Sequence, residues 1–291
     1  MKPSSFEYVL ARSVTEATDA LSGAEEATVL AGGQSLVPLM NLRLARPDVI
    51  VDINAISDLA RVEQVNGSVR LGALCRQRTL ETDPDVRRVA PLLAEAASLI
   101  GHVQIRNRGT LGGSLAHADP VSELPTAVLA LDGEIELTSG DGSRRIGARD
   151  LAVGALMTTI KPGELLTGVV VSAHRPGDGV SFVEFARRHG DFALVGIAAV
   201  LHRDEAGICT SARLAGAGLA GTPTDLTPSI EAIVGADVLS DDLLRTISDG
   251  VAASVDPWSD IHGSSEYRRE LAQVLVVEAI RSAWARTEEQ P

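Results

Sequence analysis

The sequence predicts an α+β protein built from two units, and three features of the chain support this prediction. Short segments rich in Val, Ile and Leu alternate with helical patterns through the first part of the 291 residues. The segment "HRPGDG" at 174–179 then combines proline with two glycines, as linkers do. After it, a few strand patterns give way to three helical patterns. We therefore expect one domain over 1–177 and another over 178–291.

Local signals place the elements of the first domain. "SVTE" at Ser13–Glu16 is a capping-box pattern, and the apolar residues after it have helical spacing. "APLLAEAASLI" at 90–100 and "TAVLALD" at 126–132 are also helical patterns. The predicted strands are "ATVLAGG" at 27–33, "DVIVDI" at 48–53, "SVRLGAL" at 68–74, Glu134–Thr138 and Glu164–Val171.

The second domain begins with strands and ends with helices. Its last helical pattern is strongly amphipathic. The predicted strands are Phe182–Arg187, Ala193–His202 and Thr210–Gly218, and the predicted helices cover 227–236, 241–255 and 266–286.

Composition and charge exclude several classes of partner. The chain is 45% hydrophobic with only 3% aromatic residues, so aliphatic side chains must fill the core. The formal net charge is −13, which argues against binding to nucleic acid or to an anionic membrane surface. Any phosphate bound by this chain must therefore be held locally, by peptide N–H groups.

Cys75 and Cys209 are the only cysteines, and they are typical of a reducing compartment rather than of a disulfide scaffold. An iron–sulfur cluster usually takes four Cys ligands, so this chain cannot carry one on Cys alone. The N-terminus lacks a signal-peptide pattern, and no apolar run approaches the ~20 residues of a membrane span. We expect a cytoplasmic location.

Two glycine-rich loops are the most informative motifs. "AGGQSL" at Ala31–Leu36 follows a predicted strand, and "TLGGS" at Thr110–Ser114 lies in a second loop. Adjacent glycines let peptide N–H groups point into one concavity, and a following helix adds free N–H groups. Both loops therefore have the chemistry of an anion site, with the Ser35 hydroxyl as an extra donor.

Spacing alone does not decide between a phosphate site and two ordinary turns. A single Gly-Gly between a strand and a helix is usually only a turn, and two such loops leave both interpretations open. The pattern GxGxxG of dinucleotide-binding Rossmann folds is absent from the first loop, and there is no P-loop lysine.

Longer motifs decide the matter by resemblance. "AGGQSLVPLMNLRLARPDVIVDI" and "IRNRGTLGGSLAHADPVSELPTAVLALDG" closely resemble the FAD-binding medium subunit of the molybdenum hydroxylase family, nearest to aerobic carbon monoxide dehydrogenase. The likeness continues through "FARRHGDFALVGIAAV" and "SDIHGSSEYRRELAQVL", and so covers nearly the whole chain. It implies a two-lobed FAD-binding domain, with lobes of about 1–55 and 56–177, followed by a smaller domain of antiparallel sheet plus helices.

The resemblance also implies which residues bind FAD. Both glycine loops would contact the diphosphate, and Glu123 stands where relatives have an acidic residue that bonds ribose hydroxyls. Leu166 would pack near the adenine or flavin and Phe192 near the isoalloxazine ring. The alternatives are that Leu166 is an ordinary strand residue and that Phe192 is a core residue. The implied cofactor-binding residues are Ala31, Gly32, Gly33, Gln34, Ser35, Leu36, Thr110, Leu111, Gly112, Gly113, Ser114, Glu123, Leu166 and Phe192.

Other polar residues receive no firm role. Arg106 and Arg108 flank the second loop and either assist the phosphates or are simply solvated. Asp119 is expected to cap the turn at Pro120. The six histidines show no metal-ligand spacing and no catalytic triad can be argued, so we name no catalytic or metal-ligating residue.

The function implied by the family is electron transfer. Substrate would be oxidised at a molybdenum cofactor on a large partner subunit, and electrons would pass through [2Fe–2S] clusters on a small partner to FAD on this chain and then to an external acceptor. The assembly expected is a dimer of heterotrimers. The alternatives are a self-contained FAD-dependent oxidase or reductase, and a docking subunit that has lost FAD. The substrate and the terminal acceptor are left open.

Overall fold

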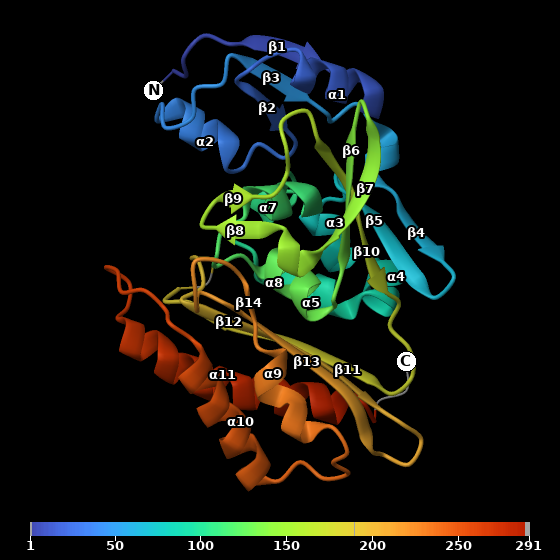
Figure 1. Cartoon of the computed structure of the whole chain (residues 1–291), viewed down its shortest axis with the longest axis vertical. Helices are drawn as coiled ribbons and strands as arrows, with labels where there is room; N and C mark the ends of the chain where they lie inside the picture. The colour runs from blue at the N-terminus through green and yellow to red at the C-terminus, as the bar shows by residue number, and fades with distance from the viewer. Residues whose placement is uncertain (1, 189, 289–291) are drawn as a thin grey trace.

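The protein has three layers stacked along its long axis (Figure 1). The computed structural model describes residues 2–188 and 190–288. The N-terminal lobe lies at one end, a second lobe occupies the middle, and the C-terminal domain forms the other end. This arrangement agrees with the predicted two-lobed first domain and smaller second domain, and the α+β prediction is confirmed.

The first lobe is a small parallel sheet with one helix packed beside it. Its strand order is β1-β3-β2, and both pairings of the central strand are parallel. The N-cap of the helix is Ser13, whose side chain accepts from the Glu16 amide as the capping box predicts. The elements are β1 (Glu7–Leu10), α1 (Val14–Ser22), β2 (Ala27–Leu30), α2 (Leu36–Asn41), β3 (Val49–Asp52) and a 3₁₀ turn at Ser57–Ala60.

The second lobe is an antiparallel sheet in the order β4-β5-β10-β6-β7, covered on one face by short helices. Alternate residues of the strands, such as Val69, Leu71 and Ile135, are fully buried under these helices. The strands are β4 (Val62–Val65), β5 (Ser68–Gly72), β6 (Glu134–Ser139), β7 (Gly142–Gly147) and β10 (Leu165–Ser172), with the hairpin β8 (Ala152–Gly154) and β9 (Met157–Thr158) after a 3₁₀ turn at Ala148–Asp150. The helices are α3 (Gln77–Thr82), α4 (Pro84–Val89), α5 (Pro91–Leu99), α6 (Val103–Arg106), α7 (Leu111–His117) and α8 (Glu123–Ala130).

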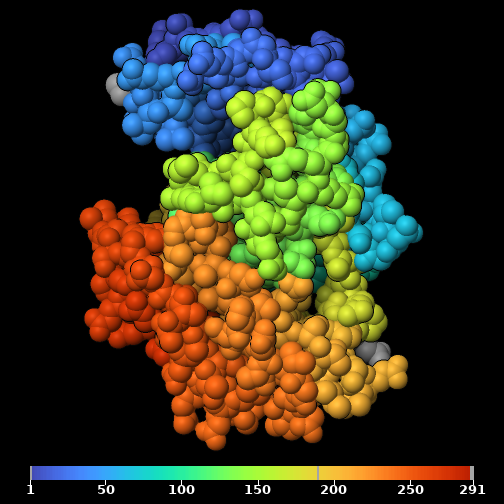
Figure 2. Space-filling view, viewed as in Figure 1, coloured from blue at the N-terminus to red at the C-terminus, as the bar shows by residue number. Residues whose placement is uncertain are grey.

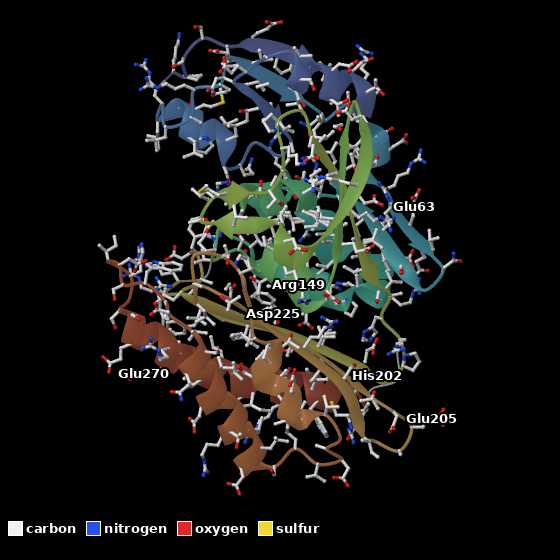
Figure 3. The ribbon with its side chains drawn as sticks, in the orientation of Figure 1. Glu63, Arg149, His202, Glu205, Asp225 and Glu270 are labelled. Atoms are coloured by element: carbon white, nitrogen blue, oxygen red, sulfur yellow. The ribbon has the colours of Figure 1, made fainter. Side chains whose placement is uncertain are left out.

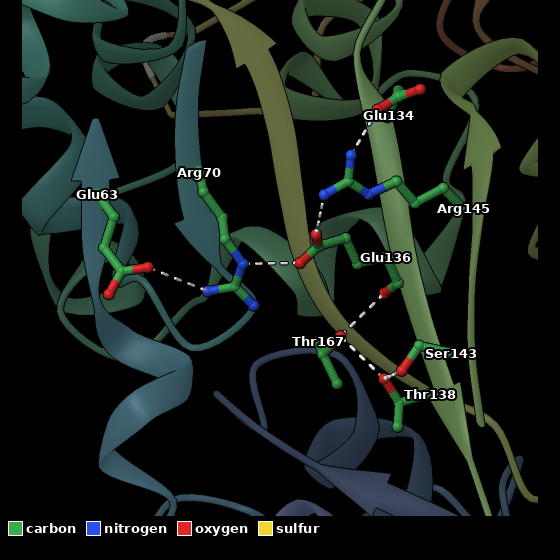
Figure 4. A network of polar contacts seen from close by, with 8 residues as sticks. All are labelled: Glu63, Arg70, Glu134, Glu136, Thr138, Ser143, Arg145 and Thr167. Atoms are coloured by element: carbon green, nitrogen blue, oxygen red, sulfur yellow. Dashed lines mark hydrogen bonds and ion pairs between the residues drawn. The ribbon is translucent and has the colours of Figure 1, made fainter. Parts of the chain in front are cut away.

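The other face of this sheet carries a network of charges (Figure 4). Arg70 Nε donates to Glu136 Oε2 at 2.7 Å, and Arg145 Nη2 donates to Glu136 Oε1 at 2.8 Å. Arg144 Nε pairs with Glu164 Oε1 at 2.6 Å. These arginines line a hollow of about 450 Å³. Because each has a carboxylate partner, the hollow offers no uncompensated charge to a ligand.

The C-terminal domain is a four-stranded antiparallel sheet in the order β11-β12-β13-β14. Side chains alternate between its two faces. Val180, Phe182 and Ala198 enter the core of the second lobe, whereas Val195 and Ile197 enter a separate core under the C-terminal helices. The elements are β11 (Asp178–Phe185), β12 (Val195–Arg203), β13 (Cys209–Ala217), β14 (Thr224–Asp225), α9 (Thr227–Ile230), a 3₁₀ turn at Glu231–Ile233, α10 (Asp241–Ser254) and α11 (Ser265–Arg286).

Most predicted elements are present, with shifted ends. The strand expected at 182–187 spans 178–185, because pairing with β12 fixes its register from Asp178 to Phe185. The helix expected at 126–132 begins at Glu123, and the one expected at 227–236 is only α9 and a 3₁₀ turn. The amphipathic prediction for α11 holds in its burial, since Ala272, Leu275, Val276, Ala279 and Ile280 are buried on one side.

A charged contact joins the C-terminal domain to the second lobe. Glu95 on α5 accepts from the Phe182 amide through Oε2 at 3.0 Å and from Arg286 Nη1 through Oε1 at 2.6 Å. Arg286 also donates to the Val180 carbonyl. The end of α11 is thereby tied to β11 and α5.

We predict that Glu95→Ala lowers the free energy of unfolding by about 2 kcal/mol, because a strand amide and a guanidinium lose a charged partner. Urea unfolding followed by circular dichroism measures the change. Glu278→Ala, an exposed glutamate of α11, is the matched control and should change the value by less than about 0.5 kcal/mol. Equal effects of the two substitutions would contradict the role assigned to Glu95.

Candidate cofactor site

The first glycine loop connects β2 to α2 and presents free peptide donors. Gly33 has φ 72°, a left-handed conformation that favours glycine. Among the described residues, no hydrogen bond is made by the amides of Gly33, Gln34 or Ser35. The Gln34 side chain folds back and donates to the Gly32 carbonyl at 3.1 Å. The loop therefore offers a group of unpaired N–H donors, as the sequence predicted.

The second glycine loop differs from the prediction of a second nest of amides. The Leu111 amide donates to the Cys75 carbonyl and the Gly112 amide to the Ala73 carbonyl, each at 2.9 Å. The Gly113 amide donates to Thr110 Oγ1 at 3.1 Å, so Thr110 caps α7. Most N–H groups of this loop are thus used inside the protein. What remains for a ligand is chiefly the Ser114 hydroxyl, because Thr110 is only 2% exposed.

The two loops lie against each other. A β-carbon built on Gly32 would lie 2.4 Å from the Arg108 carbonyl oxygen, and one built on Gly113 would lie 3.9 Å from Ala31 Cβ. Only glycine permits this approach of backbone to backbone at Gly32. Figure 2 shows the surface hollowed between the N-terminal lobe and the second lobe, next to α2 and the β8–β9 hairpin. The loops expected to share one ligand are therefore neighbours.

Asn54 and Arg76 join the two loops, and neither was predicted from the sequence. Asn54 Nδ2 donates to the Ala31 carbonyl at 2.8 Å, while Arg76 Nη2 donates to Asn54 Oδ1 at 2.7 Å. Arg76 Nη1 donates in turn to the Arg108 carbonyl. Burial lowers the pKa of Arg76, as does the neighbouring charge of Arg108. Two cationic side chains thus stand beside the loops of an acidic protein.

The two arginines named from the sequence differ in position. Arg106 is 8% exposed, and its guanidinium pairs with both oxygens of Glu81 while donating to the carbonyls of Ile100 and Gly101. It is neither solvated nor free for phosphate, so neither expectation for it holds. Arg108 is exposed at the edge of the second loop. It is the member of the pair that remains accessible to an anion.

Glu123 is the first residue of α8 and lies at the boundary with the C-terminal domain. Its side chain is 8% exposed. Burial raises its pKa to about 8, and the charges of Glu184 and Asp119 act in the same direction. Burial likewise raises the pKa of Glu184, on β11, to about 7. Asp119 caps its turn as expected, since Oδ1 accepts from the Val121 amide at 3.1 Å.

Leu166 and Phe192 are placed very differently. Leu166 on β10 is 5% exposed and belongs to the core of the second lobe, so its contact with the cofactor stays a prediction. Phe192 lies in the β11–β12 connection and is 74% exposed. This exposure excludes the alternative that Phe192 is a core residue. An aromatic ring left in solvent is available to cover a ligand, and that role also stays a prediction.

Comparisons with known proteins identify the family. Residues 4–172 match the family model of the FAD binding domain in molybdopterin dehydrogenase, and residues 180–283 match the CO dehydrogenase flavoprotein C-terminal domain. The chain belongs to the molybdenum hydroxylase FAD subunits. The resemblance stated from the sequence motifs, and FAD as the expected cofactor, are confirmed.

Relatives of this FAD subunit match it from end to end. It is 40% identical over 284 residues to 6-hydroxypseudooxynicotine dehydrogenase complex subunit alpha of Paenarthrobacter nicotinovorans, covering 97% of this chain and 96% of the relative. It is 41% identical over 287 residues to nicotine 6-hydroxylase medium subunit of the same organism, covering 99% and 100%. Reconstituted CO dehydrogenase from Oligotropha carboxidovorans contains a chain of TM-score 0.95 and 35% identity, covering 98% and 100%.

The described residues of the FAD subunit contain neither a metal-binding cluster nor a membrane-spanning helix. In the ranges 2–188 and 190–288, no group of three or more His, Cys, Asp or Glu side chains is placed to hold a metal ion. No helix of the described part has the length and apolar character needed to cross a bilayer.

We predict that Asn54→Ala weakens FAD binding by about tenfold, because the bridge that holds Ala31 beside Arg108 loses its centre. Titration of flavin fluorescence on the apo-chain measures the dissociation constant. Gln64→Ala, an exposed amide on β4, serves as the control. The prediction is wrong if both substitutions leave the constant unchanged.

The ligand-free chain should lose stability as pH rises, because Glu123 and Glu184 have raised pKa values in the folded state. The stability that their protonated carboxyls contribute to the folded chain is complete below the pKa of glutamate in the unfolded chain, near 4.5. It is lost as pH rises through their folded-state pKa values of about 7 to 8. Between about pH 5.5 and 8.5, the free energy of unfolding of Glu184→Gln should fall by on the order of 2 kcal/mol less than that of the wild type. Urea unfolding at each pH measures both values. Parallel pH profiles for the two proteins would refute this.

Proposed function

We propose that this chain binds FAD between its two glycine loops and serves as the electron-transfer subunit of a multi-subunit molybdenum hydroxylase. The observation that carries the proposal is the set of unpaired amides at Gly33, Gln34 and Ser35, in a loop that approaches the second glycine-rich segment through Gly32. Such donors suit diphosphate oxygens. Their local field is needed because the chain has a net charge of −13.

Each part of the site has a role in holding the cofactor. The first loop binds phosphate oxygens through its amides, while Ser114 adds a hydroxyl from the second loop and Thr110 holds that loop in place as the cap of α7. Arg76 and Arg108 supply positive charge beside the diphosphate. Glu123 accepts hydrogen bonds from sugar hydroxyls, and Phe192 covers an apolar ring and excludes water from one side. FAD, when bound, supplies the capacity to take up electrons singly and release them in pairs.

The chain is proposed to act with two partner subunits in the cytoplasm. A large subunit would hold the molybdenum cofactor and oxidise the substrate, and a small subunit would carry the [2Fe–2S] clusters. Its two cysteines, both buried, support this division, since four thiolates are usual for a cluster. We propose a dimer of such heterotrimers, as the family resemblance implies. Copurification of the tagged chain with a molybdenum protein and an iron–sulfur protein tests the assembly.

We predict that Gly33→Val removes FAD from the chain while the fold is retained. A β-carbon at this position would meet Leu30 Cδ1 and Val37 Cγ2 at 3.2 Å in a left-handed backbone, so the loop must change path and its amides turn away. Flavin absorbance after gel filtration measures retention, and circular dichroism checks folding.

Gly67→Val is the matched control for this substitution. Gly67 has φ 80° in the turn between β4 and β5, and no atom lies within 4 Å of a β-carbon built there. It introduces similar backbone strain far from the loops and should leave the flavin content unchanged. Full retention of flavin by the Gly33 variant would count against the site.

A further inference from the structure

Glu184 carries a buried oxygen without a partner. Among the described residues, nothing forms a hydrogen bond with Glu184 Oε2, although that atom is shielded from solvent. Unpaired buried acceptors cost free energy and are rare in folded proteins. Glu184 therefore destabilises the ligand-free chain unless another molecule supplies a donor.

Strand alternation shows where this carboxyl points. Val180 and Phe182 lie on the face of β11 that packs into the second lobe, and Glu184 is the next residue on that face. Its cross-strand neighbour on β12 is Gly196, which has no side chain to fill the adjacent space. Glu184 thus faces the FAD-binding domain from the C-terminal domain, near the base of the connection that bears Phe192.

Glu123 meets Glu184 from the opposite side of this boundary. The two carboxyls are close enough for their charges to interact, and Glu123 is 92% buried. No ion pair involving either carboxyl is present in the described part of the chain. Two buried acidic groups without a cation are unfavourable together. They form a pair of hydrogen-bond acceptors contributed by two domains.

The chemistry of this pair selects a donor-rich neutral group. Phosphate would be repelled, and a metal ion would find fewer than three protein ligands in the described residues. Hydroxyl groups of a sugar donate to carboxylates and carry no charge, so they satisfy both glutamates.

We propose that Glu184 is a second carboxyl ligand of the bound FAD, which accepts a hydrogen bond from a sugar hydroxyl across from Glu123. The inference rests on the proposed function, because it takes FAD as the ligand. Together with Phe192, it makes the C-terminal domain part of a site otherwise built by the two lobes. FAD thereby contacts both domains and couples its binding to their relative position.

The test measures FAD binding to the full-length apo-chain by quenching of flavin fluorescence. Glu184→Leu should raise the dissociation constant by at least about tenfold, because the hydroxyl loses its acceptor. Glu184→Gln keeps a side-chain oxygen of similar reach and should stay within about threefold of the wild type. Glu205→Leu is the control, since Glu205 is exposed at the far tip of the β12–β13 hairpin (Figure 3).

A second readout separates ligand binding from a structural role. Glu184→Leu removes an unpaired buried carboxyl, so the melting temperature of its apo form should equal or exceed that of the wild type. A structural glutamate would give a lower melting temperature together with weaker binding, or a chain that does not fold. Either of those results overturns the proposal, as does a dissociation constant for Glu184→Leu within twofold of the wild type.

Titrations with FMN and with ADP identify which sugar is bound. If Glu184→Leu weakens the binding of FMN as well as of FAD, the ribityl chain is the hydrogen-bond donor. If it weakens the binding of ADP instead of FMN, the adenosine ribose is the donor. Both results support the proposal. An affinity that Glu184→Leu leaves unchanged for FMN, for ADP and for FAD overturns it. A wild-type chain that binds no FAD after reconstitution overturns the proposed function itself. Wild-type binding that Glu184→Leu does not change overturns only the role of Glu184.

Discussion

The contact of one backbone with another, between Gly32 and the segment Arg108–Gly109, is the constraint on which the rest of this site depends. A side chain at position 32 would push the Arg108 carbonyl away and separate the two lobes. With hydrogen there instead, Asn54 and Arg76 span the gap and fix the loops as one unit. The glycines thus do two separate things: they allow close packing at Gly32 and Gly112, and a left-handed turn at Gly33. Neither property needs a glycine to touch the ligand.

The two loops share the work of anion binding unequally. The first loop keeps its amides free, while the second uses its own to anchor α7 on the carbonyls of Ala73 and Cys75. A loop whose donors are already paired gains rigidity, and rigidity lowers the entropic cost of binding. Arg76 and Arg108 therefore contribute more to anion binding than the two glycine motifs alone indicate. In a chain of net charge −13, Arg76 and Arg108 give the hollow a charge opposite to that of the whole molecule.

The sheet of the C-terminal domain serves two cores at once. One face of β11, β12 and β13 closes the hydrophobic core of the second lobe, and the other face is covered by α10 and α11. The face shared with the second lobe joins the two domains through one continuous apolar core, which favours one relative position. Polar groups that are buried at this boundary need hydrogen-bond partners within it. Glu95 finds Arg286 and the Phe182 amide, whereas Glu184 faces the cofactor domain with an oxygen still to be satisfied.

Local sequence determined the elements and the motifs, because capping, apolar periodicity and adjacent glycines act over only a few residues. It indicated the helix after Ser13, the strands β2, β3, β5, β6 and β10 to β13, and both glycine loops, and longer motifs indicated the family. It could not indicate β1, which pairs with β3 across some 40 residues, or the ends of β11, which β12 sets. Nor could it show that the amides of the second loop are occupied, since their acceptors come from the turn after β5. Asn54, Arg76 and Glu184 carry no motif at all. Only tertiary packing brings them to the loops or to Glu123, and burial, which depends on the whole fold, gives Glu184 its unpaired oxygen and its raised pKa.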